Sequence, residues 1–234
     1  MKRLSWLAAL TLLGATVGAS TPLAAQQTPF LYGVLEDNRY EAPSGEYTLT
    51  LPSQISLGGE IHDTPEVVTL QDHLALHASV ACFGLNLNLK RQDETLGRRD
   101  FLVGFFREHV QPQFLQRFAG AEIESARFTP ELLNGALFVY NLLPGGSMFG
   151  ERVPTMEDGS APVAKRGNLL FLHNNHIYVL SLELAEKVLA PASFDLGPEE
   201  QNALLQKRLL ELVGRMDFRA PLPLPAQPDT ESVG

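Results

Sequence analysis

The chain has 234 residues, of which 44% are hydrophobic, and its 27 acidic against 18 basic side chains give a formal net charge of −9 at pH 7. Such a negative surface repels phosphate backbones and anionic headgroups, so we expect neither nucleic acid nor an anionic membrane surface as a partner. The single cysteine, Cys82, excludes an intramolecular disulfide, and its small, apolar neighbours favour a buried thiol over a nucleophile.

The first 25 residues have the three parts of a secretory signal peptide. A positive start, MKR, precedes an uncharged apolar run over residues 4–17, and small residues lead to a cleavage point after Ala25 or Ala19. The run is shorter than the roughly 20 residues that a membrane-spanning helix needs. Cleavage after Ala25 would leave 209 of the 234 residues, with 16 basic and 27 acidic side chains. We therefore expect a periplasmic or secreted protein with no transmembrane segment after cleavage.

The first part of the remaining chain has the pattern of short strands. GEYTLTLP alternates cleanly, with Tyr47, Leu49 and Leu51 on one face and threonines on the other. Shorter candidates are LYGVLE before it and ISLGGEI and VVTL after it. HLALHASVACFGLNLNL, residues 73–89, predicts one or two further strands.

The period changes to that of a helix from Asp100, which is a candidate N-cap. Gly120 is a candidate stop, and Pro112 must kink or split the helix because proline lacks an N–H and crowds the preceding turn. The apolar stripe at helical spacing consists of Phe101, Phe105, Phe106, Val110, Phe114, Leu115 and Phe118. Such a stripe usually packs against a sheet; the alternative is that it lines a pocket for an apolar ligand.

Two strands, IESARF and ALFVYNLL, follow the helix and are separated by the turn TPELLNG. Residues 143–167 form a loop rich in glycine, proline and charge, which is long for a compact domain. GPEE marks the start of a last helix, which Gly214 ends. The proline-rich residues 220–234 predict an extended or disordered tail. The chain thus divides into a signal peptide (1–25), one domain (26–219) and this tail.

LLFLHNNHIYVLSLEL, residues 169–184, predicts a central hairpin. Two asparagines between apolar runs suit a two-residue type I′ turn, in which both central residues need a positive φ. This turn pairs His173 with His176 and Phe171 with Tyr178. Both faces of the hairpin are then apolar, so we expect it inside a sheet that has a layer on each side.

His173 and His176 share one face at the tip of this hairpin. Two histidines could coordinate a metal ion, but a stable zinc site needs three or four ligands, and no third ligand is close in sequence. We therefore expect partly exposed imidazoles, with a metal site at this pair as the alternative. His73 and His77 would lie about 13 Å apart along a strand, too far to share one ion.

LPGGSMFG contains a serine, Ser147, but no recognised catalytic motif. Phe149 stands where the nucleophile elbow GxSxG needs its last glycine, and the lysine of a phosphate-binding loop is absent. We therefore assign no catalytic residue. A hydrolase that combines Ser147 with His173 or His176 is the weakest alternative.

Three features carry a family resemblance: the GEYTLTLP start, the YVL of the late strand, and the final helix that runs into a DF segment, Leu204–Phe218. In this order they resemble the PsbP-type fold, shared by a photosystem lumenal subunit and a Ran-binding nuclear import factor, over about residues 40–218. The resemblance implies an antiparallel sheet between helices, in proteins that mostly bind other proteins. It transfers no binding residue, because none matches a functional motif.

These observations together predict an exported, non-catalytic α+β domain, an α/β/α sandwich, that binds another envelope protein and needs no cofactor. The alternative is a carrier of a small apolar ligand, held between the phenylalanine-rich helix and the sheet. A pocket of several hundred Å³ there would favour the carrier, whereas a closed core with an apolar surface patch would favour the protein-binding function. The candidate contacts for the ligand or partner are Phe101, Phe105 and Tyr178.

Overall fold

The computed structural model of the chain describes residues 31–52, 59–72, 76–148, 163–184, 187 and 194–220. The predicted signal peptide, His73, most of the predicted loop and nearly all of the proline-rich tail lie outside these residues. In chain order the elements are β1 (Val34–Glu36), β2 (Arg39–Glu41), β3 (Tyr47–Thr50), β4 (Glu60–Asp63), β5 (Val67–Gln71), β6 (His77–Gly84), α1 (Leu87–Leu96), α2 (Arg98–Phe105), the π-helical turn η2 (Phe106–Val110), α3 (Gln111–Arg117), β7 (Glu122–Thr129), β8 (Ala136–Pro144), β9 (Val163–His173), β10 (His176–Glu183), α5 (Pro198–Val213) and β11 (Met216–Phe218).

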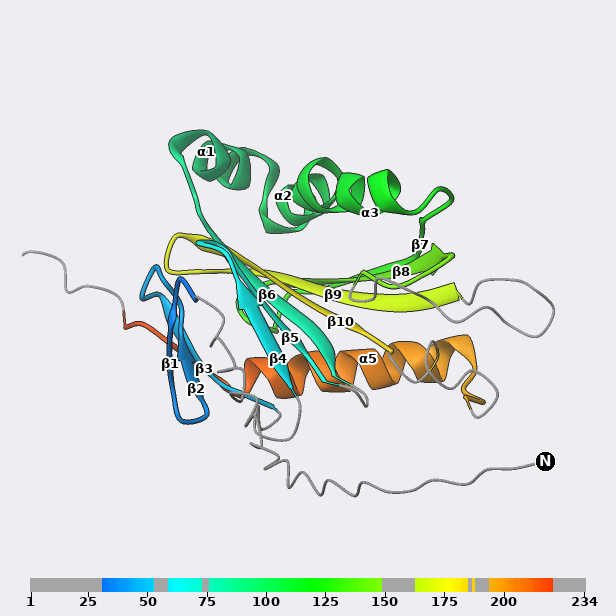
Figure 1. The fold of residues 1–234 in the computed structure, drawn as a ribbon. Helices are drawn as coiled ribbons and strands as arrows, with labels where there is room; N and C mark the ends of the chain where they lie inside the picture. Colours follow the sequence, from blue (N-terminus) through cyan, green and yellow to red (C-terminus); the bar gives the residue numbers. More distant parts are fainter. Residues whose placement is uncertain are drawn as a thin grey trace, which may run out of the picture.

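The strands form two antiparallel sheets. The larger has seven strands in the order β4-β5-β6-β10-β9-β8-β7, and the smaller has four in the order β1-β2-β3-β11. The large sheet lies between two layers: α1, α2, η2 and α3 cover one face, and α5 with the small sheet covers the other (Figure 1). The predicted α+β fold, with an antiparallel sheet between helices, is confirmed. No helix in the described ranges is long and apolar enough to cross a bilayer.

The β9–β10 hairpin occupies the middle of the large sheet. It turns through Asn174 and Asn175, whose φ angles of 47° and 60° are those of a type I′ turn. The register pairs His173 with His176, as predicted, and continues along both strands. Both strands are buried on both faces apart from their tips. The predicted turn, register and central position are therefore all confirmed.

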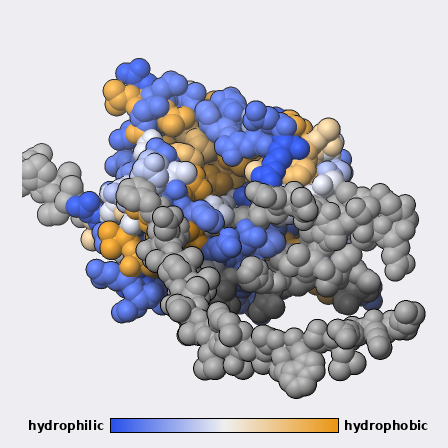
Figure 2. All heavy atoms as spheres, viewed as in Figure 1, coloured by the Kyte–Doolittle hydropathy of each residue, from blue (hydrophilic) through white to orange (hydrophobic). Residues whose placement is uncertain are grey.

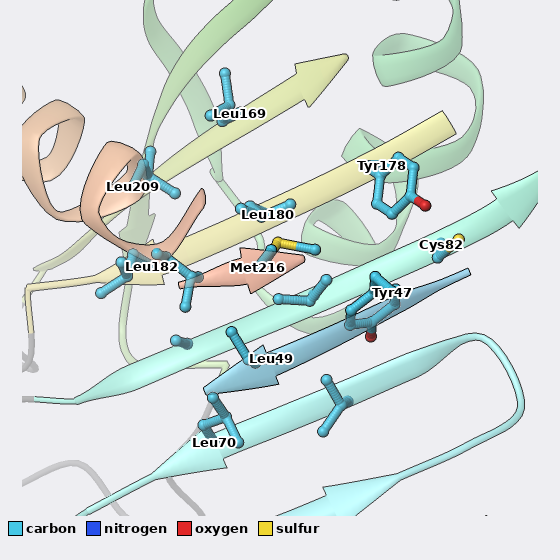
Figure 3. Close-up of a cluster of buried hydrophobic side chains, with 14 of the residues drawn as sticks. Tyr47, Leu49, Leu70, Cys82, Leu169, Tyr178, Leu180, Leu182, Leu209 and Met216 are labelled. Carbon is cyan, nitrogen blue, oxygen red and sulfur yellow. The ribbon is translucent and has the colours of Figure 1, made fainter. Parts of the chain in front are cut away.

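The core on the α5 side joins both sheets and the last helix. Tyr178 of β10 packs edge-on against Tyr47 of β3, with ring centroids 6.0 Å apart, and Leu209 of α5 lies in the same cluster (Figure 3). Gly167 of β9 lets α5 approach, because a Cβ there would lie 3.1 Å from Cβ of Leu205. The small sheet is thus attached to the large one through side chains of this core.

The predicted apolar stripe forms the core on the other side of the sheet, except for Leu115, which is exposed. Its phenylalanines are buried, as expected for a helix that packs on a sheet, and they contact the helix-facing side chains of β8, β9 and β10. Pro112 lies in the first turn of α3, directly after η2. The predicted break at this proline is therefore a π-helical turn that joins two short α-helices.

The prediction of strand up to residue 89 is wrong. β6 ends at Gly84, and the next segment is α1. Asn86 caps this helix, since its side chain accepts a hydrogen bond from the backbone N–H of Leu89 at 2.9 Å. The alternation of asparagine and leucine therefore marks a cap and a first turn. Asp100 is likewise not an N-cap, because it lies in the first turn of α2, which Gly97 precedes.

Residues 163–167 begin β9, so the prediction that they belong to a loop is also wrong. Lys165 and Arg166 are buried in this strand because each has a carboxylate partner. Lys165 pairs with Glu124, and Nη1 of Arg166 lies 3.1 Å from Oε1 of Glu183. Buried charges are tolerated when they are paired in this way.

The turn of the central hairpin can be tested with two substitutions at one position. Asn175→Ala should lower the free energy of unfolding by about 1 kcal/mol, because the left-handed conformation is strained for a residue with a Cβ and no local hydrogen-bonding side chain. Asn175→Gly should have no such cost, since glycine adopts positive φ freely. Urea unfolding of both variants measures the difference; equal losses would contradict a type I′ turn.

Candidate functional site

A cavity of about 580 Å³ lies between the helical layer and the large sheet. Side chains from β5, β6 and β10 form its floor, and side chains from α1, α2, η2 and α3 form its roof. Hydrophobic residues are visible in the recess beneath the mainly hydrophilic surface of the helices (Figure 2). The apolar lining includes Ala81, Phe83, Val179, Leu89, Phe105 and Phe114.

The outer wall of the cavity is α1. Asn86, Asn88, Leu89 and Gln92 line the cavity from this segment, yet no residue of α1 is buried. Leu89 lines the cavity from this wall, whereas the solvent side of α1 is polar except for the exposed Leu87 and Leu96. The remaining rim is also polar, since Glu108, His109 and Gln113 line the cavity from η2 and α3.

One end of the cavity meets a polar band that crosses the sheet on its helix-facing side. Ser79 of β6 lies opposite Ser181 of β10, which in turn lies opposite Asn168 of β9. Two residues further along these strands, Glu183 lies opposite Arg166. All of these residues except the half-buried Ser79 are buried.

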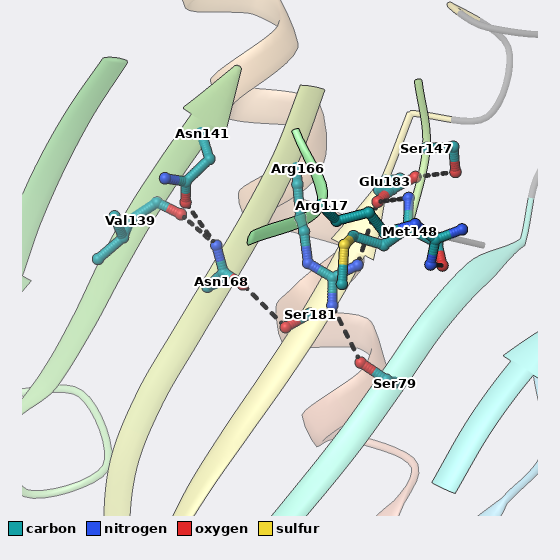
Figure 4. Close-up of polar contacts among 10 residues, drawn as sticks. All are labelled: Ser79, Arg117, Val139, Asn141, Ser147, Met148, Arg166, Asn168, Ser181 and Glu183. Atoms are coloured by element: carbon teal, nitrogen blue, oxygen red, sulfur yellow. Dashed lines mark hydrogen bonds and ion pairs between the residues drawn. The ribbon is translucent and has the colours of Figure 1, made fainter. Parts of the chain in front are cut away.

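The Arg166–Glu183 ion pair is the centre of this band (Figure 4). Arg166 donates from Nη1 to Oε1 of Glu183 at 3.1 Å and from Nη2 to Oγ of Ser79 at 3.2 Å. Glu183 also accepts from the hydroxyl of Ser147 and from the backbone N–H of Met148 at 3.0 Å. The pair therefore fixes the segment after β8 onto the sheet, where Met148 becomes part of the cavity wall.

A second chain of hydrogen bonds runs from the cavity toward β8. The hydroxyl of Ser181 donates to Oδ1 of Asn168 at 2.8 Å, and Nδ2 of Asn168 donates to Oδ1 of Asn141 at 2.9 Å and to the carbonyl of Val139 at 3.2 Å. Bonds of this kind in a low-dielectric interior fix the side-chain rotamers. The polar end of the cavity is therefore held rigidly by groups behind it.

The guanidinium of Arg166 is charged but compensated. Burial lowers its pKa, and the neighbouring Glu183 counteracts this; arginine nevertheless stays protonated in proteins. The guanidinium carbon also lies 5.4 Å from the centre of the Phe114 ring, within cation–π distance. This end of the cavity is therefore bounded by an ion pair whose two charges cancel. Nη2 of the guanidinium is directed toward Ser79.

The three predicted contact residues are separated by the structure. Phe105 lines the cavity. Phe101 is buried behind it in the helical core, with ring centroids 6.2 Å apart. Tyr178 faces the α5 side of the sheet, where its ring stacks on Phe171. A ligand in this cavity would therefore meet Phe105 and not Tyr178.

His173 and His176 lie side by side at the hairpin tip, as predicted. Nδ1 of His176 lies 2.9 Å from the carbonyl oxygen of Asn174 and 3.6 Å from Oε2 of Glu46, and the His173 ring packs on Phe218 with centroids 4.7 Å apart. No three His, Cys, Asp or Glu side chains of the described residues are grouped so that they could hold a metal ion. At the tip, His173 thus makes a ring contact and His176 makes polar contacts.

The geometry does not bring Ser147 to the hairpin histidines. Its partner, Glu183, is seven residues from His176 along β10, which corresponds to about 23 Å in a strand. The side chains of Glu183 and His176 also point to opposite faces of the sheet, since they are an odd number of residues apart. The geometry therefore contradicts a hydrolase that combines Ser147 with His173 or His176.

Sequence reasoning missed the polar band, although the signal was present. The predicted register of the hairpin extends past its apolar pairs and places Asn168 opposite Ser181 and Arg166 opposite Glu183. On the helix-facing side, both strands therefore change from apolar to polar at the same point. The assignment of residues 163–167 to a loop concealed this coincidence.

Comparisons with known proteins give likenesses of structure. No family model and no curated protein matches the chain. A solved structure of cyanobacterial PsbP from Synechocystis sp. PCC 6803 has 12% identity and a TM-score of 0.45, over 85% of this chain and 100% of that one. A mutant of the protein Mog1 has 12% identity and a TM-score of 0.44, over 79% of this chain and 96% of that one.

A third similar structure is a protein of Bacteroides thetaiotaomicron, with 9% identity and a TM-score of 0.36, over 80% of this chain and 50% of that one. The predicted PsbP-type resemblance is thus found among solved structures. At such low identities the likeness concerns the fold alone, and it assigns no role to any residue of the cavity.

The ion pair can be tested by removing one or both charges. Arg166→Met and Glu183→Leu should each lower the free energy of unfolding by about 3–5 kcal/mol, because each leaves a buried charge without its partner. The double variant should lose less than the sum of the two, since no uncompensated charge remains. Urea unfolding measures all three, and strictly additive losses would contradict the coupling.

Cys82 is buried on the α5 side, and burial raises the pKa of its thiol to about 11. At pH 8 the folded protein should therefore react with an aromatic disulfide reagent at least about 100-fold more slowly than the urea-unfolded chain, in which the thiol has an ordinary pKa near 8.5. Absorbance of the released thiolate gives both rates. Equal rates would contradict the burial of Cys82 and reopen a reactive role.

Proposed function

We propose that this domain is a non-catalytic carrier that binds a small ligand with an elongated apolar body between its helical layer and its sheet. The observation that carries the proposal is the cavity of about 580 Å³, which falls within the range of about 300–1,000 Å³ that is typical of ligand sites. Its floor is mainly apolar, whereas its rim and one end carry polar side chains, so apolar and polar residues contribute equally to the lining. Apolar surface with polar groups that fix the orientation of the ligand is typical of such sites.

The placement of the cavity relative to the core supports this function. The phenylalanine-rich helices seal one part of the sheet, but over β6 and β10 the floor consists of the small side chains Ser79, Ala81 and Ser181 together with Val179. Small floor residues leave space under helices that rest on larger neighbours. An apolar body placed there would be removed from water, which is favourable in proportion to the area that it buries.

A non-catalytic role is supported by the groups near the cavity. Ser147 donates its hydroxyl proton to Glu183, and this carboxylate is already held by Arg166. A serine nucleophile needs an adjacent general base that is itself free to take the proton. The arrangement favours a structural serine, which ties the chain after β8 to the sheet.

Binding of another envelope protein is the second candidate function. Its support is α1, which buries no residue and exposes Leu87 and Leu96, with 75% and 55% of their surface accessible. A contiguous apolar patch marks a contact between proteins, whereas singly scattered apolar side chains are normal on any surface, and these two leucines lie at opposite ends of α1.

Export of the chain also remains a prediction, because the signal-peptide segment lies outside the described residues.

The carrier function predicts that the purified chain binds the uncharged fluorescent probe N-phenyl-1-naphthylamine, whose emission rises in apolar surroundings. Ala81→Phe should weaken this binding at least about tenfold, because the added ring fills space that the probe needs. Ala126→Phe is the matched control, since Ala126 is exposed on the edge strand β7, and it should leave the affinity unchanged.

Fluorescence titration measures both affinities, and circular dichroism checks that both variants fold. If the probe fails to bind the unaltered chain, or if both variants lose affinity equally, the carrier function is wrong. Native mass spectrometry after detergent-free purification complements the titration. A retained small mass supports the carrier, whereas a stoichiometric protein mass would support the second candidate.

A further inference from the structure

The cavity has a polar end that a purely apolar ligand does not require. Ser79, Ser181 and Arg166 line it there, and the groups behind them are buried and hydrogen-bonded. Buried polar groups cost free energy unless they are satisfied, so a simple apolar cavity would more readily be lined by valine or alanine at these places. The polar end therefore indicates that the ligand carries a polar group, an inference that rests on the carrier function proposed above.

Ser79 is placed to donate a hydrogen bond into the cavity. Its oxygen accepts from Nη2 of Arg166 at 3.2 Å, so its lone pairs are directed at least in part toward the guanidinium. Within the described part of the chain, its own hydroxyl proton has no acceptor, and the side chain is only half-buried. A hydroxyl that accepts from a cation becomes a stronger donor, because the two bonds polarise each other.

Ser181 differs from Ser79 in this respect. Its proton is already donated to Asn168 at 2.8 Å, so it presents only acceptor lone pairs to the cavity. Of the two serines at the polar end, Ser79 is therefore the one that can donate to a ligand oxygen. The chain of hydrogen bonds through Asn168 prevents Ser181 from taking that role without breaking a buried bond.

The charge of the polar end selects against an ionised ligand. Arg166 is already paired with Glu183, and no second lysine or arginine lines the cavity within the described ranges. A carboxylate bound there would compete with Glu183 for Arg166 or remain without a partner, and an unpaired buried charge is strongly disfavoured. An ammonium group at this end would meet the guanidinium, which carries the same charge; Glu108, which also lines the cavity, is an exposed residue of the rim on η2.

We propose that the cavity selects an uncharged amphipathic molecule, of the alcohol, ester or amide class, whose oxygen accepts a hydrogen bond from Ser79. Its apolar body extends from there over Ala81 and Val179 toward Phe83 and α1. Ser79 and Phe83 are four residues apart on β6, which sets a length of about 13 Å for the body. The Arg166–Glu183 pair positions Ser79 and does not itself bind the ligand.

The test is displacement of N-phenyl-1-naphthylamine from the purified chain by four compounds with one eight-carbon body: octanol, octanamide, octanoate and octylamine. At pH 8, octanol and octanamide should displace the probe at concentrations at least about tenfold lower than the two charged compounds. Preference for octanoate or octylamine would overturn the proposal, because the head group would then pair with a charge.

Substitution of Ser79 separates hydrogen bonding from simple apolar preference. Ser79→Ala should weaken octanol and octanamide about fivefold to tenfold relative to any change in the affinity of the probe itself, which is the effect of one lost hydrogen bond. Ser79→Thr keeps the hydroxyl and should retain the affinity for octanol. Ser125→Ala, at an exposed serine of β7, is the matched control and should change neither affinity.

The outcomes distinguish this inference from the function on which it rests. If the probe binds but Ser79→Ala leaves octanol unaffected, the carrier stands and the hydrogen bond from Ser79 is wrong. If the probe itself does not bind, both are wrong. If Ser79→Ala does not fold, Ser79→Thr is the deciding variant. The proposal is supported if this variant binds both octanol and the probe with the affinity of the unaltered chain. It is overturned if the variant binds the probe but no longer binds octanol.

Discussion

Burial of the central hairpin on both of its faces is the constraint on which the rest of the structure depends. Strands β9 and β10 have apolar side chains on both sides over much of their length, so neither face can remain in water. One face is covered by α5 and the small sheet, in which residues 34–50 pair with residues 216–218. The other requires the phenylalanine-rich helices. The two layers thus follow from one pair of strands.

The helix-facing side of the sheet is not uniform, and this non-uniformity creates the cavity. Toward the hairpin tip, Leu170, Leu172 and Ile177 contact the phenylalanine core directly. Toward the other end of the strands, the same face carries the ion pair and the serine–asparagine chain, which need polar partners. Helices that seal the apolar part cannot close over small floor residues beside a polar band. The space between them is the proposed site.

Local signals in the sequence were sufficient for the elements that local chemistry determines. The Asn-Asn turn requires positive φ, Pro112 interrupts a helical hydrogen-bond ladder, and both effects act within a few residues. Residues 163–167 could not be assigned in this way, because Lys165 and Arg166 enter a strand only when Glu124 and Glu183 compensate them. The cavity depends on three separate segments, so only Phe105 among its lining residues was predicted as a contact. Asn86 is a different case, because its capping bond to Leu89 acts within three residues; the local signal for α1 was present and was read as the alternation of a strand.

A binding protein needs both a stable fold and a site that suits its ligand, and the position of α1 separates these two requirements. This helix forms the outer wall of the cavity, yet it contributes no buried residue to either core. Substitutions there can change the width and polarity of the cavity with little effect on folding. A lineage that inherits this domain could therefore acquire a new cargo by drift in one exposed helix, while the hairpin and its covering layers stay fixed.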